Sequence, residues 1–358
     1  MPLWRLYGPP LLLLCLLNQV QTQVENRVVF LPGTFQNVSL SQNETVQVEV
    51  SRVQTDAAFI TLQFHTQHRN TTLSYTRFSG AGGSHSAVDP GLVSPLDPGQ
   101  TSMVLFLSTA DSEPVSGTGI VLQYSSSDPV PGGCNVEFNL DIDPNIYIHY
   151  NLYETTIRFA PANLGIERGE PAPACDATTG PFSRWRLEYD VFQFFLPEND
   201  LSEQSLFRAL ETVADTEGMV LNGNKVLTVS SADRTVAVFS SIPGQGVIYS
   251  VIVRDPLLNS SASYIPAHTY ACSFSSNLDS CYTLGKISTK IFFTITGLAG
   301  LFVCFLGHRF FKCELFCMGF SFTAFFFFVL ISRLTGLDYD IRLALSALMG
   351  SWVESSWL

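Results

Sequence analysis

The segment GIVLQYSSSDPVPGG, residues 119–133, indicates the fold of most of the chain. It joins a run of β-branched, aromatic and apolar residues to a turn rich in Pro and Gly, which is the pattern of an antiparallel strand and its following turn. Runs of the same kind recur before residue 290: ETVQVEV (44–50), FITLQFH (59–65), MVLFLST (103–109), VEFNLDI (136–142), IYIHYNLYE (146–154), VLTVS (226–230), TVAVFSS (235–241) and VIYSVIVRD (247–255). Only LSEQSLFRALETVADTE (201–217) has helical periodicity, with Asp200 or Ser202 as its N-cap. We therefore predict a mainly β ectodomain with one small helix.

A weak internal repeat predicts two tandem antiparallel β-sandwich domains. In each half a sheet-like run precedes a Gly-x-Gly turn, a second run, an Asp-Pro pair and a cysteine, Cys134 in the first half and Cys272 in the second. Duplication of one sandwich unit would explain this order, and so would chance similarity between β segments. The two-domain interpretation assigns residues 23–138 to the first sandwich and 139–289 to the second.

The N-terminus has the features of a secretory signal peptide. Residues 1–22 contain one arginine, a short apolar core from Leu11 to Leu17, and then small and polar residues. The alternative, a first membrane span, is disfavoured because the apolar run is short and Pro9 and Pro10 interrupt it. The chain after residue 22 is therefore expected to emerge outside the cytosol.

Two apolar runs near the C-terminus predict a membrane hairpin. A bilayer core about 30 Å thick needs roughly 17 to 25 apolar residues to be crossed by a helix, and the sequence offers such runs at 290–307 and 315–333. The loop between them, 308–314, carries His308, Arg309 and Lys312. Short basic loops stay cytosolic, so both ends of the chain are expected on the outer side.

Sequons and cysteines agree with that topology. Four Asn-x-Ser/Thr sequons precede the first predicted span, at Asn37, Asn43, Asn70 and Asn259. Four cysteines also lie in this region, which predicts two disulfides in an oxidising compartment. Three pairings are open; we favour Cys134 with Cys175 and Cys272 with Cys281 because each closes a local loop.

Composition and charge exclude several functions. The chain has 358 residues, of which 46% are hydrophobic and 14% charged, with a formal charge of -12, so it is not a disordered tail. Residues 24–289 hold 13 Lys and Arg against 27 Asp and Glu, a balance of -14, which argues against nucleic acid as a partner. Expected partners are membrane lipid, a protein ligand of the ectodomain, and a helix that approaches the small-residue row Thr296, Gly300 and Cys304.

No motif predicts catalysis, a cofactor or a metal centre. His65 and His68 have metal-like spacing but lie beside a sequon, and we expect both on the surface. The segment DIDPN, residues 141–145, begins like a calcium loop but lacks the turning Gly and the closing Glu, which excludes an EF-hand. A different calcium site using Asp141 and Asp143 stays open, as does a hydrolase site that only folding could assemble.

Long segments of the chain resemble a known membrane-protein family. They are YSSSDPVPGGCNVEFNLDIDPNIYIHYNLYETTIRFAPANLG (124–165), SRWRLEYDVFQFFLPENDL (183–201), PGQGVIYSVIVRDPLLNSSASYIPAHTYACSF (243–274) and GHRFFKCELF (307–316). They resemble the transmembrane 7 superfamily member 3 family over roughly residues 59–350. The resemblance implies a glycosylated ectodomain followed by seven helices, with no catalytic residues to carry over.

The same resemblance implies a role in cellular homeostasis. Family membership would imply a pro-survival factor that attenuates endoplasmic-reticulum stress and the unfolded protein response, inhibits cytokine-induced cell death and supports insulin secretion. The alternative is a receptor-like or transporter-like seven-span protein of which this chain is a fragment. The chain departs from the family pattern at Ser351, where IRLALSALMG gives way to SWVESSWL, so residues 334–358 are expected to form a truncated third-span stub.

Overall fold

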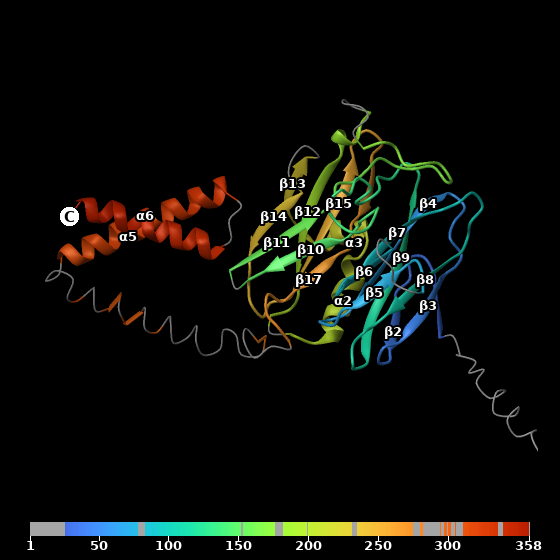
Figure 1. Ribbon diagram of the computed structural model, residues 1–358, viewed down its shortest axis with the longest axis horizontal. Helices are drawn as coiled ribbons and strands as arrows, with labels where there is room; N and C mark the ends of the chain where they lie inside the picture. Colours follow the sequence, from blue (N-terminus) through green and yellow to red (C-terminus); the bar gives the residue numbers. More distant parts are fainter. Residues whose placement is uncertain are drawn as a thin grey trace, which may run out of the picture.

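The computed structural model describes two β-rich domains and two C-terminal helices (Figure 1). The described residues are 26–77, 83–151, 153–175, 182–198, 200–230, 235–274, 280–281, 294, 297–298, 300–301, 305, 311–335 and 339–357. Nine strands precede residue 126 and eight follow residue 145, so the predicted division at 138/139 falls in the connection between the two groups.

The first domain is a sandwich of two sheets. One sheet has the strand order β1-β3-β8-β5-β6 and the other β2-β9-β4-β7. Alternating apolar side chains of both sheets, such as Val48, Leu62 and Leu107, are at most 1% exposed and form the core. The strands are β1 (Arg27–Phe30), β2 (Gln36–Leu40), β3 (Thr45–Val50), β4 (Ala57–His65), β5 (Thr71–Ser74), β6 (Ser84–Ala87), β7 (Gly91–Pro95), β8 (Met103–Ser108) and β9 (Val115–Ser125).

The second domain packs a three-stranded sheet, β10-β11-β14, against a larger sheet, β13-β12-β15-β16, in which β17 also pairs with β15. Tyr189, Tyr249 and Tyr264 are each at most 1% exposed in the shared core. The strands are β10 (Ile146–Tyr150), β11 (Glu154–Phe159), β12 (Glu188–Phe195), β13 (Asn224–Ser230), β14 (Val236–Ser240), β15 (Val247–Asp255), β16 (Ser260–Ser263) and β17 (Ala267–Thr269), with a short 3-10 turn η1 (Arg184–Arg186) before β12.

The predicted helix forms, and Ser202 is its cap. Helix α2 (Glu203–Val213) begins after Ser202, whose Oγ accepts from the Ser205 N–H at 3.3 Å, while Asp200 holds the Ser202 hydroxyl at 2.6 Å. A second helix, α3 (Thr216–Asn222), comes next, capped by Asp215. Leu206, Leu210 and Met219 are fully buried against the face of β12 and β15 that turns away from the β10-β11-β14 sheet.

One predicted strand is wrong. Residues 136–142 form turns and bends instead of a strand, and Val136 is 96% exposed. The Asn135 side chain accepts from the N–H groups of Glu137 and Phe138 at 3.0 and 2.9 Å and also donates to two carbonyls. Such local bonds offer the backbone an alternative to a strand ladder, and here they win over the apolar run.

Strand β4 is buried on both faces, which joins the two domains. Ile60, Leu62 and Phe64 face the core of the first domain, whereas Phe59 packs in the core of the second. Every residue of β4 is buried, so the outer face of the β2-β9-β4-β7 sheet is covered by the second domain and its helices.

Two helices, α5 (Phe311–Leu334) and α6 (Tyr339–Trp357), lie side by side beyond the second domain (Figure 1). The predicted span 315–333 falls within α5, and α6 continues through Ser351 to Trp357. Helix α5 includes residues 311–314 of the predicted loop 308–314, which contain no Pro or Gly to interrupt a helix. Across the described residues, no helix meets the length and hydropathy expected of a membrane span.

Candidate functional site

A buried carboxylate between the two domains binds two histidines. Asp89, just before β7, is 8% exposed; its Oδ1 lies 2.8 Å from His65 Nδ1, and both its oxygens lie 2.9 Å from His268 Nδ1. His65 ends β4 and His268 lies in β17, so the cluster joins elements about 200 residues apart in sequence. The expectation that His65 is a surface residue is wrong because the second domain covers that face of β4; His68 is exposed as expected.

Geometry shows that His268 is doubly protonated. Its Nδ1 faces the Asp89 carboxylate and its Nε2 lies 3.0 Å from the Gln67 carbonyl oxygen, so both ring nitrogens meet acceptors and each must donate. Burial alone would lower the pKa of His268, but the charge and hydrogen bond of Asp89 and the Gln67 carbonyl raise it overall. Burial would raise the pKa of Asp89, but the two histidines hold it well below its ordinary value.

This Asp-His arrangement lacks a nucleophile. In a hydrolytic triad the second ring nitrogen of the histidine faces a Ser, Thr or Cys side chain. Here a carbonyl oxygen takes that position on His268, and the Gln63 side chain lies 3.4 Å from His65 Nε2. The cluster therefore serves to hold the domains together.

Two small cavities flank the segment from Gln67 to Arg69 beside the cluster. One, of about 160 Å³, is lined by His68, His268, Tyr150, Tyr270, Phe274 and neighbouring residues; the other, of about 190 Å³, is lined by residues of that segment, of 114–116 and by Glu203. His68 lines both and stacks on Phe274 with ring centroids 5.1 Å apart. Burial, followed by the Arg69 charge, lowers the pKa of His68. We call these two cavities and the segment between them the cleft. Its first cavity presents aromatic side chains, and its second also presents the charged Arg69 and Glu203.

The Asp89 cluster gives a testable pH dependence. Asp89 has a lowered pKa, so its contribution is present above its ordinary value of 3.8 and is lost as the pH falls through the lowered pKa. His268 has a raised pKa, so its contribution is present below its ordinary value of 6.5 and is lost as the pH rises through the raised one. We expect the melting temperature of the purified chain to be higher at pH 5.5 than at pH 8. His268→Gln should flatten this difference; an unchanged profile would contradict the assignment.

A second interdomain contact explains the calcium-like segment. The Asn145 side chain accepts from the Gly91 N–H at 2.8 Å and donates to the Gly91 carbonyl at 3.0 Å. Its amide thus makes the pair of hydrogen bonds that the backbone of a neighbouring strand would make, here across the interface. Asp143, fully buried, fixes that amide by accepting from Asn145 Nδ2 at 2.9 Å and also accepts from the Tyr147 hydroxyl at 2.7 Å. Asp141 is exposed, and among the described residues no cluster of three metal-binding side chains occurs. Asp143 therefore has a structural role.

Arg168 provides a third interdomain contact. Its guanidinium donates to backbone carbonyls of the first domain: those of Asp97 at 3.1 Å, Gln100 at 2.9 Å and Gln54 at 2.7 Å, together with that of Ala57. No local pattern marks Arg168, because its partners lie about 70 to 110 residues away in the sequence. Asp89 and His268, which are 179 residues apart, could not be predicted for the same reason.

Replacing Arg168 should destabilise the interface. We expect Arg168→Ala to lower the free energy of unfolding by about 2 kcal/mol, since the carbonyls lose charge-assisted donors. Arg168→Lys should recover only part of this, because an ammonium cannot span all four acceptors. Urea unfolding of the purified chain measures both, with Arg208→Ala, on the exposed face of α2, as the matched control. Equal effects of the Arg168 and Arg208 changes would refute the role of Arg168.

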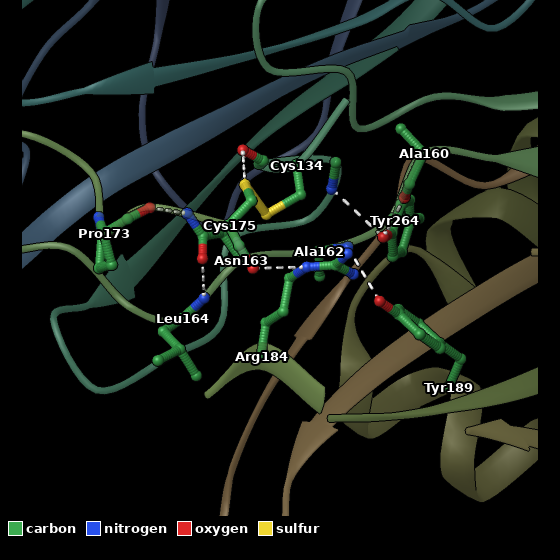
Figure 2. Close-up of a disulfide and its surroundings, with 12 residues drawn as sticks. Cys134, Ala160, Ala162, Asn163, Leu164, Pro173, Cys175, Arg184, Tyr189 and Tyr264 are labelled. Carbon is green, nitrogen blue, oxygen red and sulfur yellow. Dashed lines mark hydrogen bonds between the residues drawn. A yellow bond between two sulfur atoms is a disulfide. The ribbon is translucent and has the colours of Figure 1, made fainter. Parts of the chain in front are cut away.

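The four ectodomain cysteines form two disulfides, Cys134 with Cys175 and Cys272 with Cys281. Figure 2 shows the first of them beside hydrogen bonds that hold the same loop. Asn163 Nδ2 donates to the Pro173 carbonyl at 2.7 Å and Arg184 Nε donates to the Cys175 carbonyl at 2.8 Å. Behind it, Tyr264 donates to the Ala160 carbonyl at 2.6 Å, and Tyr189 accepts from the Ala162 N–H at 2.9 Å. The disulfide thus ties an exposed loop to the buried tyrosine core.

Gly132, next to this disulfide, occupies a position that excludes a side chain. Its φ is +68°, and a Cβ would lie 1.7 Å from the Asp143 carbonyl oxygen. We expect Gly132→Ala to cost about 3 kcal/mol, from backbone strain and from overpacking against a main chain that cannot move freely. Gly99→Ala is the control, because Gly99 has φ +77° with open space around it. Similar melting temperatures for the two variants would show that close approach contributes nothing.

The remaining predicted site residues are the sequon asparagines and those near the helices. All four sequon asparagines are exposed, and Asn43 and Asn259 have positive φ values of 51°. Lys312 lies in the first turn of α5, and Gly300 lies in a helical segment with open space around it. Thr296, Cys304, His308 and Arg309 lie outside the described residues.

Comparison with known proteins identifies relatives over most of the chain. Family models match residues 26–124 (TM7SF3-like, N-terminal immunoglobulin-like domain), 129–275 (TM7SF3-like, second immunoglobulin-like domain) and 293–353 (TM7S3/TM198-like domain). "Transmembrane 7 superfamily member 3" of Rattus norvegicus is 50% identical over 90% of the chain, and that of Homo sapiens is 49% identical over 91%. The chain spans 57% of the length of both. A solved β-glucuronidase from Bacteroides uniformis matches at 9% identity over 64% of this chain and 26% of its own, with a TM-score of 0.27, and carries no argument.

Proposed function

The chain belongs to the transmembrane 7 superfamily member 3 family of membrane proteins, and from this premise we propose that its two immunoglobulin-like domains form one rigid, non-enzymatic binding module outside the cytosol. The observation that carries the proposal is the interface between the domains. There the buried Asp89 carboxylate, the Asn145 side-chain amide and the Arg168 guanidinium each bind a residue of the opposite domain. A fixed interface holds the cleft at Gln67–Arg69 in one shape, which lowers the entropy cost of binding. A protein ligand suits this cleft because aromatic side chains line one of its two cavities.

The proposed location is the secretory pathway and cell surface, with residues 290–307 and 315–333 as membrane spans. The signal peptide, the sequons and the basic loop support it. Exposure of Asn37, Asn43, Asn70 and Asn259 leaves each sequon accessible to glycosylation, and pairing of all four ectodomain cysteines suits an oxidising compartment.

Topology is tested with a C-terminal epitope tag. In sealed microsomes we expect protease to leave the tag intact, and after detergent lysis we expect glycosidase to reduce the apparent mass of the chain. A tag digested in sealed microsomes, or a mass that glycosidase does not change, would overturn the proposed arrangement.

Family membership supports a finer proposal about cellular output. We propose that the chain promotes cell survival by attenuating endoplasmic-reticulum stress and the unfolded protein response, that it inhibits cytokine-induced cell death, and that it supports insulin secretion. The chain covers 57% of its relatives' length, so this proposal concerns what the ectodomain and the first helices retain.

A stress-reporter assay tests binding and output together. In cells depleted of their own family member, expression of the chain should lower an unfolded-protein-response reporter after calcium-pump inhibition. His68→Asp, at the centre of the cleft, should abolish the effect, whereas Leu257→Ser, on the exposed turn after β15, should not. An active His68→Asp variant would exclude the cleft as the binding site, and an inactive unmodified chain would refute the stress role.

A further inference from the structure

One end of the second domain gathers exposed apolar side chains. Strand register brings the end of β10 to the start of β11 (Tyr150 opposite Thr155), the start of β11 to the end of β14 (Glu154 opposite Ser240), and the end of β12 to the start of β15 (Phe195 opposite Val247). At this end Tyr150, Tyr153, Phe195 and Ile242 are 40, 53, 41 and 51% exposed. We call these four residues the apolar rim.

The same end contacts the helical part of the chain. Arg342, in the first turn of α6, forms an ion pair with Glu154, and their side chains are only 9% and 18% exposed. The Tyr150 hydroxyl donates to the Cys272 carbonyl at 3.2 Å, where the chain leaves β17 on its way to the helices. In Figure 1 the pair α5 and α6 extends away from the domain beyond the β10 and β11 end. The apolar rim therefore surrounds the junction between the ectodomain and the helices.

Charge and surface chemistry at this junction suit a bilayer surface. Glu154 neutralises Arg342, so neither group has to be buried alone. Tyrosine combines an apolar ring with a polar tip and is favoured at the headgroup level of membranes. The surface continues onto the helices, where Phe322, Phe325 and Leu334 are 76, 68 and 74% exposed.

We propose that the apolar rim rests in the headgroup region of the bilayer that α5 crosses, so that the second domain stands on the membrane in a fixed orientation. This rests on the proposed membrane anchoring. The partner is lipid with choline headgroups and not anionic lipid. Residues 24–289 carry a charge of -14, so anionic headgroups would repel them. The Glu154–Arg342 pair then fixes the height of the rim relative to the helices.

Site-specific photocrosslinking in the full chain tests the proposal. A benzophenone amino acid is placed at Tyr153 or Ile242 in the rim, or at Leu258 as the control, which is 51% exposed beyond the far end of β15. That strand is nine residues long, so its two ends lie about 26 Å apart. In cells fed a clickable choline phospholipid, irradiation should attach lipid several-fold more at 153 and 242 than at 258.

The outcomes distinguish a failure of the rim proposal from a failure of the proposed membrane anchoring. Retention of the chain in alkaline carbonate reports anchoring independently of crosslinking. A chain that stays in the membrane but gives protein adducts at 153 and 242, or lipid adducts no stronger than at 258, overturns the rim proposal alone. A chain that carbonate releases overturns the proposed anchoring as well. The single variant Glu154→Arg should reduce the lipid adducts at 242. The double variant Glu154→Arg, Arg342→Glu should restore them. If Glu154→Arg has no effect, the ion pair does not fix the height of the rim.

Discussion

Asp89→Ala is expected to lower the free energy of unfolding by about 3 to 5 kcal/mol, the range observed when one partner of a buried ion pair is removed. The carboxylate is the common acceptor for His65 and His268, and it also accepts from the His268 N–H at 2.9 Å. Its loss leaves a buried imidazolium without its counter-charge and the His268 backbone N–H without its acceptor, at the contact between the domains.

Urea unfolding of the purified chain at pH 7 measures this cost. Asp56→Ala removes an exposed carboxylate before β4 and should stay within about 0.5 kcal/mol of the unmodified chain. Asp89→Asn keeps the shape and one acceptor but removes the charge, so it should fall between the two. If Asp89→Asn equals the unmodified chain, the charge of Asp89 contributes nothing and hydrogen bonding alone holds the cluster.

Local sequence patterns predicted the β architecture where burial was one-sided or continuous. The run at 247–255 is β15, and the run at 59–65 lies within β4. The run at 146–154 divides into β10 and β11, because Asn151 accepts from the N–H groups of Tyr153 and Glu154 and turns the chain. At 136–142 the same kind of asparagine bonding, from Asn135, removed the strand altogether.

The interface could not be predicted from the sequence because its partners are distant and its residue types are not distinctive. Asp89 lies in a Pro- and Gly-containing segment that reads as a turn, and His268 is 179 residues further along the chain. From Ile60 to His65 the strand β4 alternates apolar and polar residues, which predicts one buried face, so the sequence does not reveal that a second domain covers the polar face as well. The fold class can therefore be predicted from local pattern, whereas the position of the cleft depends on the packing of one domain on the other.

The Cys134–Cys175 disulfide should contribute more to stability than Cys272–Cys281. Crosslinking restricts the unfolded chain more as the closed loop lengthens, and the two loops span 41 and 9 residues. The chain-entropy relation gives about 4 kcal/mol for the first and about 2.5 kcal/mol for the second. We therefore expect the double variant Cys134→Ser, Cys175→Ser to have the lower melting temperature of the two serine pairs.

Limited proteolysis distinguishes this effect from a general loss of folding. In the Cys134→Ser, Cys175→Ser variant the loop near Pro173 loses its covalent link and is held only by the hydrogen bonds from Asn163 and Arg184, so cleavage should begin there while the tyrosine core stays protected. The Cys272→Ser, Cys281→Ser variant should instead become sensitive near Phe274, at the exit toward the helices. If loss of the second pair is the more destabilising, loop length does not govern the contribution of a disulfide. The contact of the Tyr150 hydroxyl with the Cys272 carbonyl at the apolar rim is then the stronger explanation, because its loss would free the ectodomain from its junction with the helices.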